Sequence, residues 1–188
     1  FKPFAEQQKP RATVVTCSDS RVHTHALNKN PDGDLFMVRN IGNQLALLQN
    51  HGFKNLYGIE IFPKAVETAK TRTKDINIIQ GTVFDIPFKN DVFDLVFTAG
   101  VLIHINPKDI KKALKEIYRV SNKYIWGYEY YHPTHISIDY RGNKNRLWKG
   151  DFCQMYLDHF PNLKIVKRKK LKYLDSDNHD EMFLLKKK

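Results

Sequence analysis

The chain has 188 residues, of which 41% are hydrophobic and 27% are charged, proportions that are typical of a globular protein with one buried core. No apolar run reaches the roughly 18–20 residues that cross a bilayer, and two cysteines make no disulfide framework, so we expect a cytoplasmic protein with no membrane partner. The formal net charge of +11 is the one unusual value, and it raises the question of an acidic partner.

Much of this charge lies in three basic runs, at 108–115, 164–172 and 186–188. Such runs form either a binding face for nucleic acid or the solvated faces of helices and edge strands. The sequence contains no recognition-helix pattern, zinc-finger spacing or ribonucleoprotein aromatic motif. The second interpretation is therefore favoured, and nucleic acid is the less expected partner.

The first 43 residues contain two short predicted strands, the β-branched Arg11–Thr16 and a second at Leu35–Arg39, separated by a turn-rich loop. The first run leads into Cys17-Ser-Asp-Ser-Arg21, and the second leads into Asn40-Ile-Gly42-Asn43. This pair of motifs resembles the start of a β-class carbonic anhydrase. In that family the cysteine is a zinc ligand, and the Asp–Arg pair gates the fourth zinc position.

A catalytic zinc site needs three protein ligands and one open position. The anhydrase family takes its other two ligands from a downstream His-x-x-Cys, which this chain lacks, and Cys153 is the only other cysteine. We therefore expect no bound metal, and a zinc-dependent carbonic anhydrase remains only as an alternative.

From Asn40 onward the chain alternates predicted strands and helices, which indicates an α/β fold with a parallel sheet and right-handed crossovers. Pro63 suits the first turn of a helix, and Gly52 suits a helix C-cap. The expected strands are 56–61, 76–80, 94–98, 124–131, 163–168 and 182–186, and the expected helices are 45–49, 63–70, 107–120 and 151–159.

Polar or small residues stand at the ends of three of these strands. Glu60 is placed to accept hydrogen bonds from both hydroxyls of a ribose, and Asp85 is placed to meet an adenine amino group. The stretch from Phe93 to His104 has the pattern of a buried strand that ends at Thr98–Gly100, where a ligand can lie at the carboxyl edge. The order of these groups predicts a nucleotide-type site.

Four motifs then make a family resemblance specific. They are Gly100-Val-Leu-Ile-His-Ile-Asn-Pro107, Glu129-Tyr-Tyr131, Tyr140-Arg-Gly142 and Asp151-Phe152. From about residue 40 onward the chain resembles the methylases associated with pseudaminic acid biosynthesis, which are class I S-adenosylmethionine-dependent methyltransferases. The resemblance implies a Rossmann-like, doubly wound, mostly parallel seven-stranded sheet whose last strand is antiparallel. It also implies S-adenosylmethionine as cofactor, held by Asn40, Gly42, Glu60, Ile61, Asp85, Ile86, Thr98 and Gly100.

Methyl transfer requires a nucleophile aligned with the sulfonium methyl, sometimes with help from a base. His104 and Tyr131 are the catalytic candidates because both follow strands that point at the site. Glu129 and Tyr130 are candidates to line the acceptor pocket, or to pack on flanking helices. Arg141 and Lys149 are candidates to hold an anionic acceptor. The expected partner is thus a small acceptor, with an anionic or sugar-derived molecule in view.

The sequence departs from this family at Phe36 and Val38, where the family has the glutamate and glycine of a Glu-x-Gly in its first strand. The chain thus has the form of a fusion near Asn40, with a carbonic-anhydrase-like segment at 1–34 and a methyltransferase-like domain at 35–188. We expect Leu35–Arg39 to be the first strand of the sheet and Arg11–Thr16 to be an extra strand or arm. An impaired cofactor site, in a methyltransferase or a non-catalytic relative, is the corresponding expectation.

Overall fold

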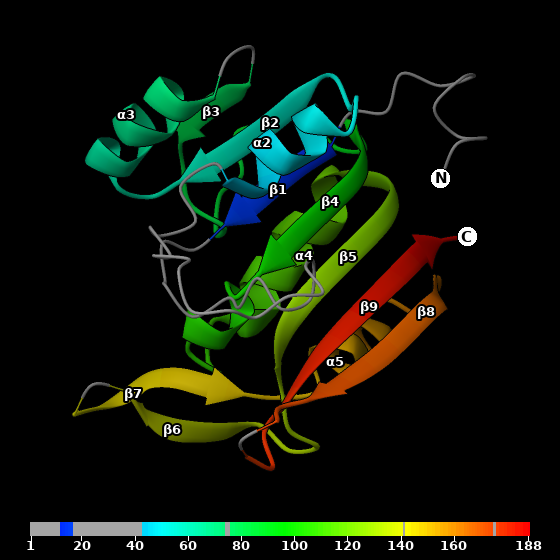
Figure 1. Ribbon diagram of the computed structural model, residues 1–188. Helices are drawn as coiled ribbons and strands as arrows, with labels where there is room; N and C mark the ends of the chain where they lie inside the picture. The colour runs from blue at the N-terminus through cyan, green and yellow to red at the C-terminus, as the bar shows by residue number, and fades with distance from the viewer. Residues whose placement is uncertain (1–11, 17–42, 74–75, 141, 175) are drawn as a thin grey trace.

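The computed structural model describes residues 12–16, 43–73, 76–140, 142–174 and 176–188. Within these ranges the chain forms one large mixed sheet with helices on both faces and a separate two-stranded hairpin (Figure 1). No helix in the described part of the chain is long and apolar enough to cross a membrane.

The described strands of the large sheet number seven and follow the order β3-β2-β1-β4-β5-β9-β8. The first five positions pair in parallel, whereas β9 is antiparallel to both of its neighbours. The order reverses between β1 and β4, which makes the sheet doubly wound. The bounds are β1 Ala12–Thr16, β2 Leu56–Glu60, β3 Asn77–Gln80, β4 Phe93–Ala99, β5 Ser121–Tyr131, β8 Leu163–Lys172 and β9 His179–Lys187.

The central strand β1 corrects one expectation from the sequence. Ala12–Thr16 pairs in parallel with β2 on one side and with β4 on the other, so it is neither an extra strand nor an arm. The position expected for Leu35–Arg39 is thus taken by the earlier β-branched run, and Leu35–Arg39 itself lies outside the described residues. The proposed division at residues 34 and 35 stays a prediction.

Helices α2 (Asn43–Asn50) and α3 (Pro63–Arg72) cover one face of the sheet at the β2–β3 end (Figure 1). The core on this face joins Leu45, Val66 and Ala69 to Leu56 and Phe97 of the strands. Gly52, just past α2, has a φ of +85°, which agrees with its predicted place as a helix C-cap.

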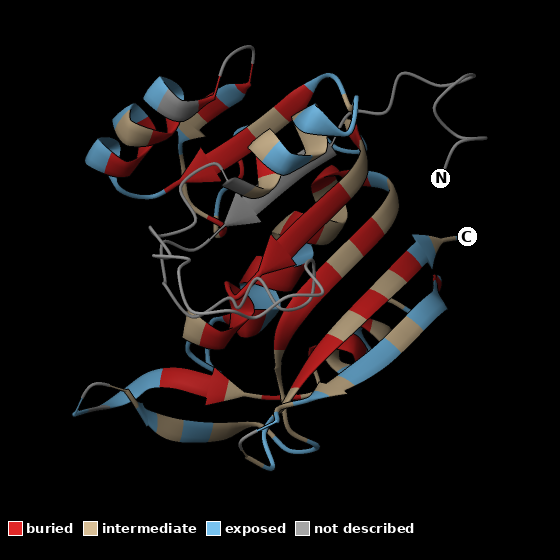
Figure 2. Cartoon of the chain, viewed as in Figure 1, coloured by how far each residue is buried: buried red, intermediate tan, exposed pale blue. Residues whose placement is uncertain are grey.

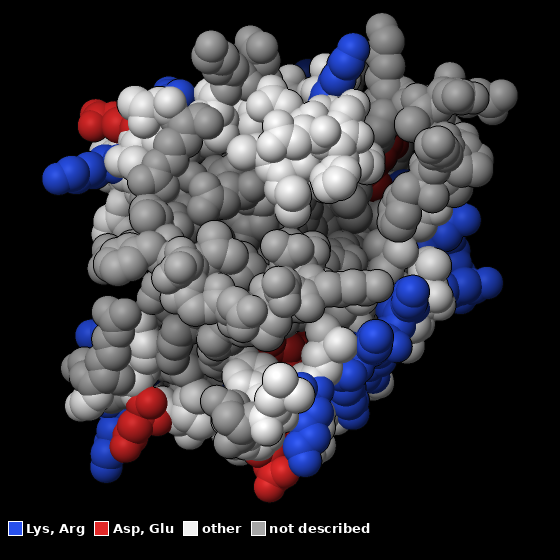
Figure 3. Space-filling view, viewed as in Figure 1, with Lys and Arg blue, Asp and Glu red and all other residues white. Residues whose placement is uncertain are grey.

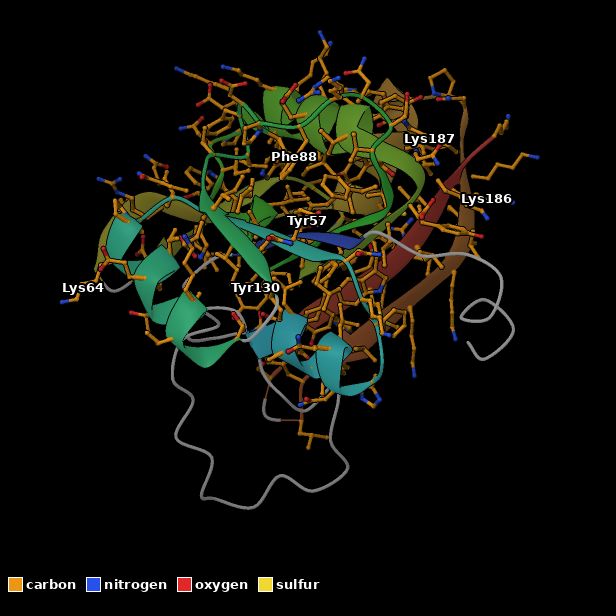
Figure 4. All side chains as sticks on the ribbon, turned by 90° about the horizontal axis from the view of Figure 1, so that it is seen from above. Tyr57, Lys64, Phe88, Tyr130, Lys186 and Lys187 are labelled. Atoms are coloured by element: carbon orange, nitrogen blue, oxygen red, sulfur yellow. The ribbon has the colours of Figure 1, made fainter. Side chains whose placement is uncertain are left out.

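Helices α4 (Ile110–Val120) and α5 (Phe152–His159) cover the other face. The predicted apolar stripe of α4 is buried as expected, at Ile110, Ala113, Leu114 and Ile117. Figure 2 shows that the buried residues concentrate along β4, β5 and β9. Beside α4 the rings of Tyr57 and Phe88, both labelled in Figure 4, meet edge to face at 5.7 Å.

The sequence did not predict the hairpin of β6 (Ile136–Tyr140) and β7 (Asn143–Lys149), which follows β5. Its two strands pair antiparallel, and Leu147 and Trp148 are its buried residues. Figure 1 shows the hairpin beyond the carboxyl end of β4, next to the short 3₁₀ turn η2 (Leu102–His104). The hairpin therefore borders the edge of the sheet where a ligand is expected.

Candidate active site

The carboxyl ends of β2, β4 and β5 bring the predicted site residues to one edge of the sheet. Because β1 lies between β2 and β4 in the sheet order, this edge includes the point where the strand order reverses. Ligands of doubly wound sheets bind in the crevice outside the carboxyl ends of the strands at such a point. The fold thus places the candidate site without reference to any single side chain.

Glu60 is the last residue of β2 and is only 5% exposed. Its Oε1 accepts a hydrogen bond from the backbone N–H of Ile61 at 2.9 Å, whereas its Oε2 is buried and has no hydrogen-bond partner among the described residues. Burial raises the pKa of this carboxyl group, and hydrogen bonds from the backbone of Ile61 and Phe62 oppose that shift. A buried carboxylate oxygen without a donor is costly, which makes Glu60 the strongest candidate at this edge for contact with a hydrogen-bond donor from a ligand.

Two large apolar side chains beside Glu60 are unusually exposed. Ile61 is 56% exposed and Phe62 is 60% exposed, although both precede a helix that buries its own apolar residues. The side chain of Gln80, from the end of β3, donates to the backbone oxygen of Ile61 at 3.4 Å. An apolar surface next to a polar acceptor suits a flat heterocycle with an attached hydroxylated sugar.

Asp85 lies in a turn after β3, where Thr82 and Asp85 form an isolated bridge. Asp85 is exposed, and its side chain is accessible to a ligand at this edge. Ile86, in contrast, is 1% exposed, and its backbone N–H donates to Glu116 Oε2 at 2.9 Å. Its carbonyl oxygen accepts from Arg119 at 2.8 Å. Ile86 therefore anchors the turn in the core, while Asp85 is available to a ligand.

Thr98 and Gly100 end β4 in different ways. The Thr98 side chain is 1% exposed and hydrogen bonds to Glu129, so its hydroxyl has a partner within the protein. Gly100 has a φ of +65°, which favours glycine, and its N–H donates to the Tyr128 carbonyl oxygen at 2.9 Å. The strand end is thus a tightly held turn that requires glycine at residue 100.

Glu129 on β5 lies beneath this turn and is 2% exposed. Its Oε1 accepts from the Val101 N–H at 3.3 Å, and its Oε2 accepts from the Ile103 N–H at 3.4 Å. Burial raises the pKa of Glu129 to about 7, opposed by hydrogen bonds from Thr98 and from the backbone of residues 101–103. The sequence placed Glu129 among residues that line an acceptor pocket, but the structure uses its carboxylate to support η2.

His104 ends η2 and is half-buried. Its Nδ1 lies 3.1 Å from the carbonyl oxygen of Arg146 on β7, and its ring is 5.8 Å from that of Tyr140 on β6. The imidazole is therefore positioned by the hairpin that follows β5. This contact could not be expected from the sequence, because the hairpin itself was not predicted.

Tyr131, the second catalytic candidate, ends β5 and is half-buried. The Lys170 ammonium on β8 lies 3.7 Å from the centre of its ring, a close cation–π contact. The structure thus brings His104 and Tyr131 to the same edge but gives them separate partners. Tyr131 borders a cationic group, whereas His104 borders the hairpin.

A second polar cluster near this edge was missed in the sequence. Asp180 on β9 is buried, and its two carboxylate oxygens accept from Tyr128 Oη at 2.6 Å and from Tyr173 Oη at 3.0 Å. Burial, followed by the contact with Asp180, raises the pKa of Tyr128. Lys149 hydrogen bonds to Asn178 and lies 6.0 Å from the centre of the Tyr130 ring, and burial lowers its pKa. In the sequence, the tyrosines at alternate positions 128 and 130 of β5 were the signal from which this cluster could have been predicted.

Cys153 is fully buried in α5, and burial raises the pKa of its thiol to about 12. Among the residues the structure describes, no group of three His, Cys, Asp or Glu side chains is arranged to hold a metal ion. Cys17, Asn40 and Gly42, which the motifs single out, lie outside those residues.

Family models match two overlapping parts of the chain. A methyltransferase domain model matches residues 40–123, and a carbonic anhydrase model matches residues 12–61. The β carbonic anhydrase 1 of Caenorhabditis briggsae is 30% identical over 95 residues, which are 50% of this chain and 35% of the relative. The chain therefore spans about a third of that relative.

Solved structures resemble the fold along its whole length. A protein of Pyrococcus horikoshii superposes with a TM-score of 0.64 at 16% identity, covering 100% of this chain and 87% of that one. A Burkholderia thailandensis 1,6-didemethyltoxoflavin-N1-methyltransferase, determined with S-adenosylhomocysteine, superposes with a TM-score of 0.66 at 11% identity and covers 95% and 72%. The chain therefore has the fold of class I S-adenosylmethionine-dependent methyltransferases.

Proposed function

We propose that the protein binds S-adenosylmethionine at the carboxyl edge of β1, β2 and β4 and transfers its methyl group to a small acceptor. The observation that carries this proposal is Glu60, a buried carboxylate at the end of β2 whose Oε2 has no hydrogen-bond donor among the described residues. The two hydroxyls of a ribose are donors of the kind that this oxygen needs. The methyltransferase fold and the family-model match from residue 40 support the same cofactor.

The residues present fit the adenosine part of this cofactor. Glu60 would hold the ribose, the exposed side chain of Ile61 would pack on the adenine ring, and Asp85 would accept from the adenine amino group. Gly100 would leave space for the rest of the cofactor beside the end of β4. Ile86 and Thr98 act through the protein core, because both are buried and bonded there. Asn40 and Gly42 remain predicted contacts.

When bound, the cofactor supplies an electrophilic methyl group on a sulfonium. The chain's own residues would orient the acceptor at the end of β4 and exclude water from it. His104, held through Nδ1, presents its other ring nitrogen as the candidate to take a proton from the acceptor. Tyr131, with Lys170 over its ring, would border the acceptor on the β5 side.

The acceptor class to test first is suggested by a cation at this edge. The Lys149 ammonium lies 6.0 Å from the centre of the Tyr130 ring, on the face of the sheet that Tyr130 shares with Asp180. Ammonium groups beside aromatic rings suit a small anionic molecule that offers a flat or hydroxylated face. The resemblance to methylases of pseudaminic acid biosynthesis supports a sugar-derived acid as the first acceptor to test.

Isothermal titration calorimetry with S-adenosylmethionine and S-adenosylhomocysteine tests the cofactor site directly. We expect micromolar binding that Glu60→Gln weakens by at least about tenfold, since the neutral amide is the weaker acceptor for the ribose. Asp85→Ala should weaken binding less, because Asp85 is exposed. The matched control is Glu67→Gln, which neutralises an exposed glutamate on α3. Equal affinity in wild type and E60Q would overturn the assignment of Glu60.

One observation favours a second candidate, a methyltransferase fold whose cofactor site is impaired. The first strand of the sheet is Ala-Thr-Val-Val-Thr, which has neither an acid nor a glycine, and the Glu-x-Gly positions at Phe36 and Val38 are also substituted. A folded protein with no calorimetric response to either ligand would support this candidate. Binding gained by Phe36→Glu with Val38→Gly would show that residues 36 and 38 still contribute to the site.

A further inference from the structure

The outermost strand of the sheet, β8, presents different cations on its two faces. On the face toward α5, Arg168 bonds to Asp151 and Glu181, and Lys170 lies on the Tyr131 ring. The next cation on this face, Lys172, pairs with Asp177. These cations are therefore used within the protein.

The opposite face carries a set of lysines that we call the lysine row, which consists of Lys164, Lys167, Lys169 and Lys186. The register shows that they share a face, because Lys164 pairs with Lys186, Lys167 with Leu184, and Lys169 with Met182. Side chains alternate between the two faces along β9, so Phe183 points to the face opposite that of Met182 and Leu184. Its ring centre lies 6.0 Å from that of Tyr156 on α5, so the lysine row is on the face away from α5. All four lysines are exposed.

The lysine row has no carboxylate partner among the described residues, in contrast to its neighbours. Lys187, next to Lys186, bonds to Asp91 and lies over the Tyr118 ring of α4. Figure 4 labels Lys186 and Lys187, which point to different sides of the sheet. In the space-filling view lysine and arginine side chains form a blue line along one edge of the molecule (Figure 3).

The geometry of the row limits what can bind it. Three of its members lie along one strand, where alternate side chains of one face repeat at about 6.7 Å. This is comparable to the spacing of phosphates along an extended single strand of nucleic acid. A membrane surface would meet charges spread over a plane, whereas three of these four lie in a line along β8. Half-buried Met182 and Leu184 lie beside that line on β9. β8 also contains no acidic residue that would repel a polyanion.

We propose that the lysine row is a docking surface for the phosphate backbone of single-stranded nucleic acid. The strand would run along β8, with successive phosphates at Lys169, Lys167 and Lys164, and with the next phosphate at Lys186, which is paired with Lys164 across the ladder. The sequence favoured solvated basic faces because it could not show which lysines share a face. The proposal does not rest on methyl transfer, since the row lies on β8 and β9 rather than at the cofactor edge.

Fluorescence anisotropy with a labelled 20-nucleotide oligouridylate tests this surface, with the affinity measured across a series of salt concentrations. Four phosphate contacts predict a slope of log K against log salt of about −2.8. Replacing all four lysines of the row by glutamine should weaken binding at least about tenfold and remove most of that slope.

The matched control replaces four exposed lysines on and just before α4 by glutamine, at Lys108, Lys111, Lys112 and Lys115, which lowers the net charge by the same amount. We expect this variant to bind within about threefold of wild type. Equal losses in the two variants would show a net-charge effect only and overturn the proposal. Stronger binding to anionic vesicles or to polyglutamate than to the oligonucleotide, lost in the row variant, would also overturn it. Calorimetry with S-adenosylhomocysteine should give the same result for both variants.

Discussion

Glu60 at the end of β2 and Glu129 near the end of β5 are both almost fully buried, and burial raises the pKa of both carboxyl groups. Their hydrogen bonds differ. Glu129 uses both oxygens to hold the turn after β4, whereas Glu60 uses one oxygen and leaves Oε2 without a donor among the described residues. Burial alone therefore does not mark a ligand site. The marker is a buried acceptor whose partner must come from outside the folded core.

The largest expected effect is a difference in the free energy of unfolding between variants of these two glutamates. Glu129→Ala should lower the free energy of unfolding by about 3 kcal/mol, because it leaves the buried donors of Thr98 and residues 101–103 without an acceptor. Glu60→Ala should cost no more than about 1 kcal/mol, since the backbone donors of Ile61 and Phe62 that it releases are next to exposed side chains and the carboxylate it removes is disfavoured by burial. Urea unfolding monitored by circular dichroism measures both values. Equal losses would contradict the contrast.

The next effect is the dependence of stability on pH. Burial raises the pKa of Glu129 from the ordinary value of 4.5 to about 7, so the folded state holds this proton more tightly than the unfolded chain does. This contribution to stability is complete below pH 4.5 and is lost as the pH rises through 7. The protein should thus lose about 2 to 3 kcal/mol of stability between about pH 5 and about pH 8 from this group.

Unfolding of Glu129→Gln across the same pH range provides the control. The amide does not titrate, so the pH dependence should shrink, with a remainder of the same sign from Glu60 and Glu181, whose pKa values burial also raises. If the wild type were as stable at the upper end of this pH range as at the lower end, Glu129 would not carry a raised pKa.

The smallest effect concerns a hydroxyl near Glu129. Tyr156 is fully buried, and its Oη has no hydrogen-bond partner among the described residues. Tyr156→Phe should therefore be neutral or stabilise the fold by up to about 1 kcal/mol. Tyr128→Phe is the matched comparison, because it breaks the 2.6 Å bond to Asp180 and should cost about 1 to 2 kcal/mol. In thermal unfolding the midpoint temperature should therefore fall for Y128F, whereas for Y156F it should rise or stay unchanged.

Much of the fold could be predicted from local pattern. The apolar run of β4 and the amphipathic stripe of α4 are long enough to specify both the element and its buried side. The central strand was assigned wrongly, because the family resemblance favoured Leu35–Arg39, which leads directly into Asn40-Ile-Gly42. Arg11–Thr16 has the higher β-branched content, but the pairing that places it in the sheet involves residues more than 40 positions away.

The site divides in the same way. The prediction that Glu60 and Asp85 face one ligand could be made from the sequence, because parallel strands bring their carboxyl ends, and the turns that follow them, to one edge. The support that Glu129 gives to η2, and the contact of His104 with the hairpin, depend on how distant strands pack. Those roles follow from tertiary contacts, which a pattern of spacing does not contain.

The position of β1 has a consequence for how the molecule opens. In the sheet order β2 and β3 reach β4 only across this five-residue strand. The strand lies within the part matched by the carbonic anhydrase family, whereas β4 lies within the methyltransferase match. Loss of the Ala12–Thr16 ladder would leave β2 and β4 joined by side-chain packing alone, as between Leu56 and Phe97, so hydrogen exchange of β2 should follow that of β1. The strand that makes the sheet continuous thus precedes the residues that the methyltransferase model matches.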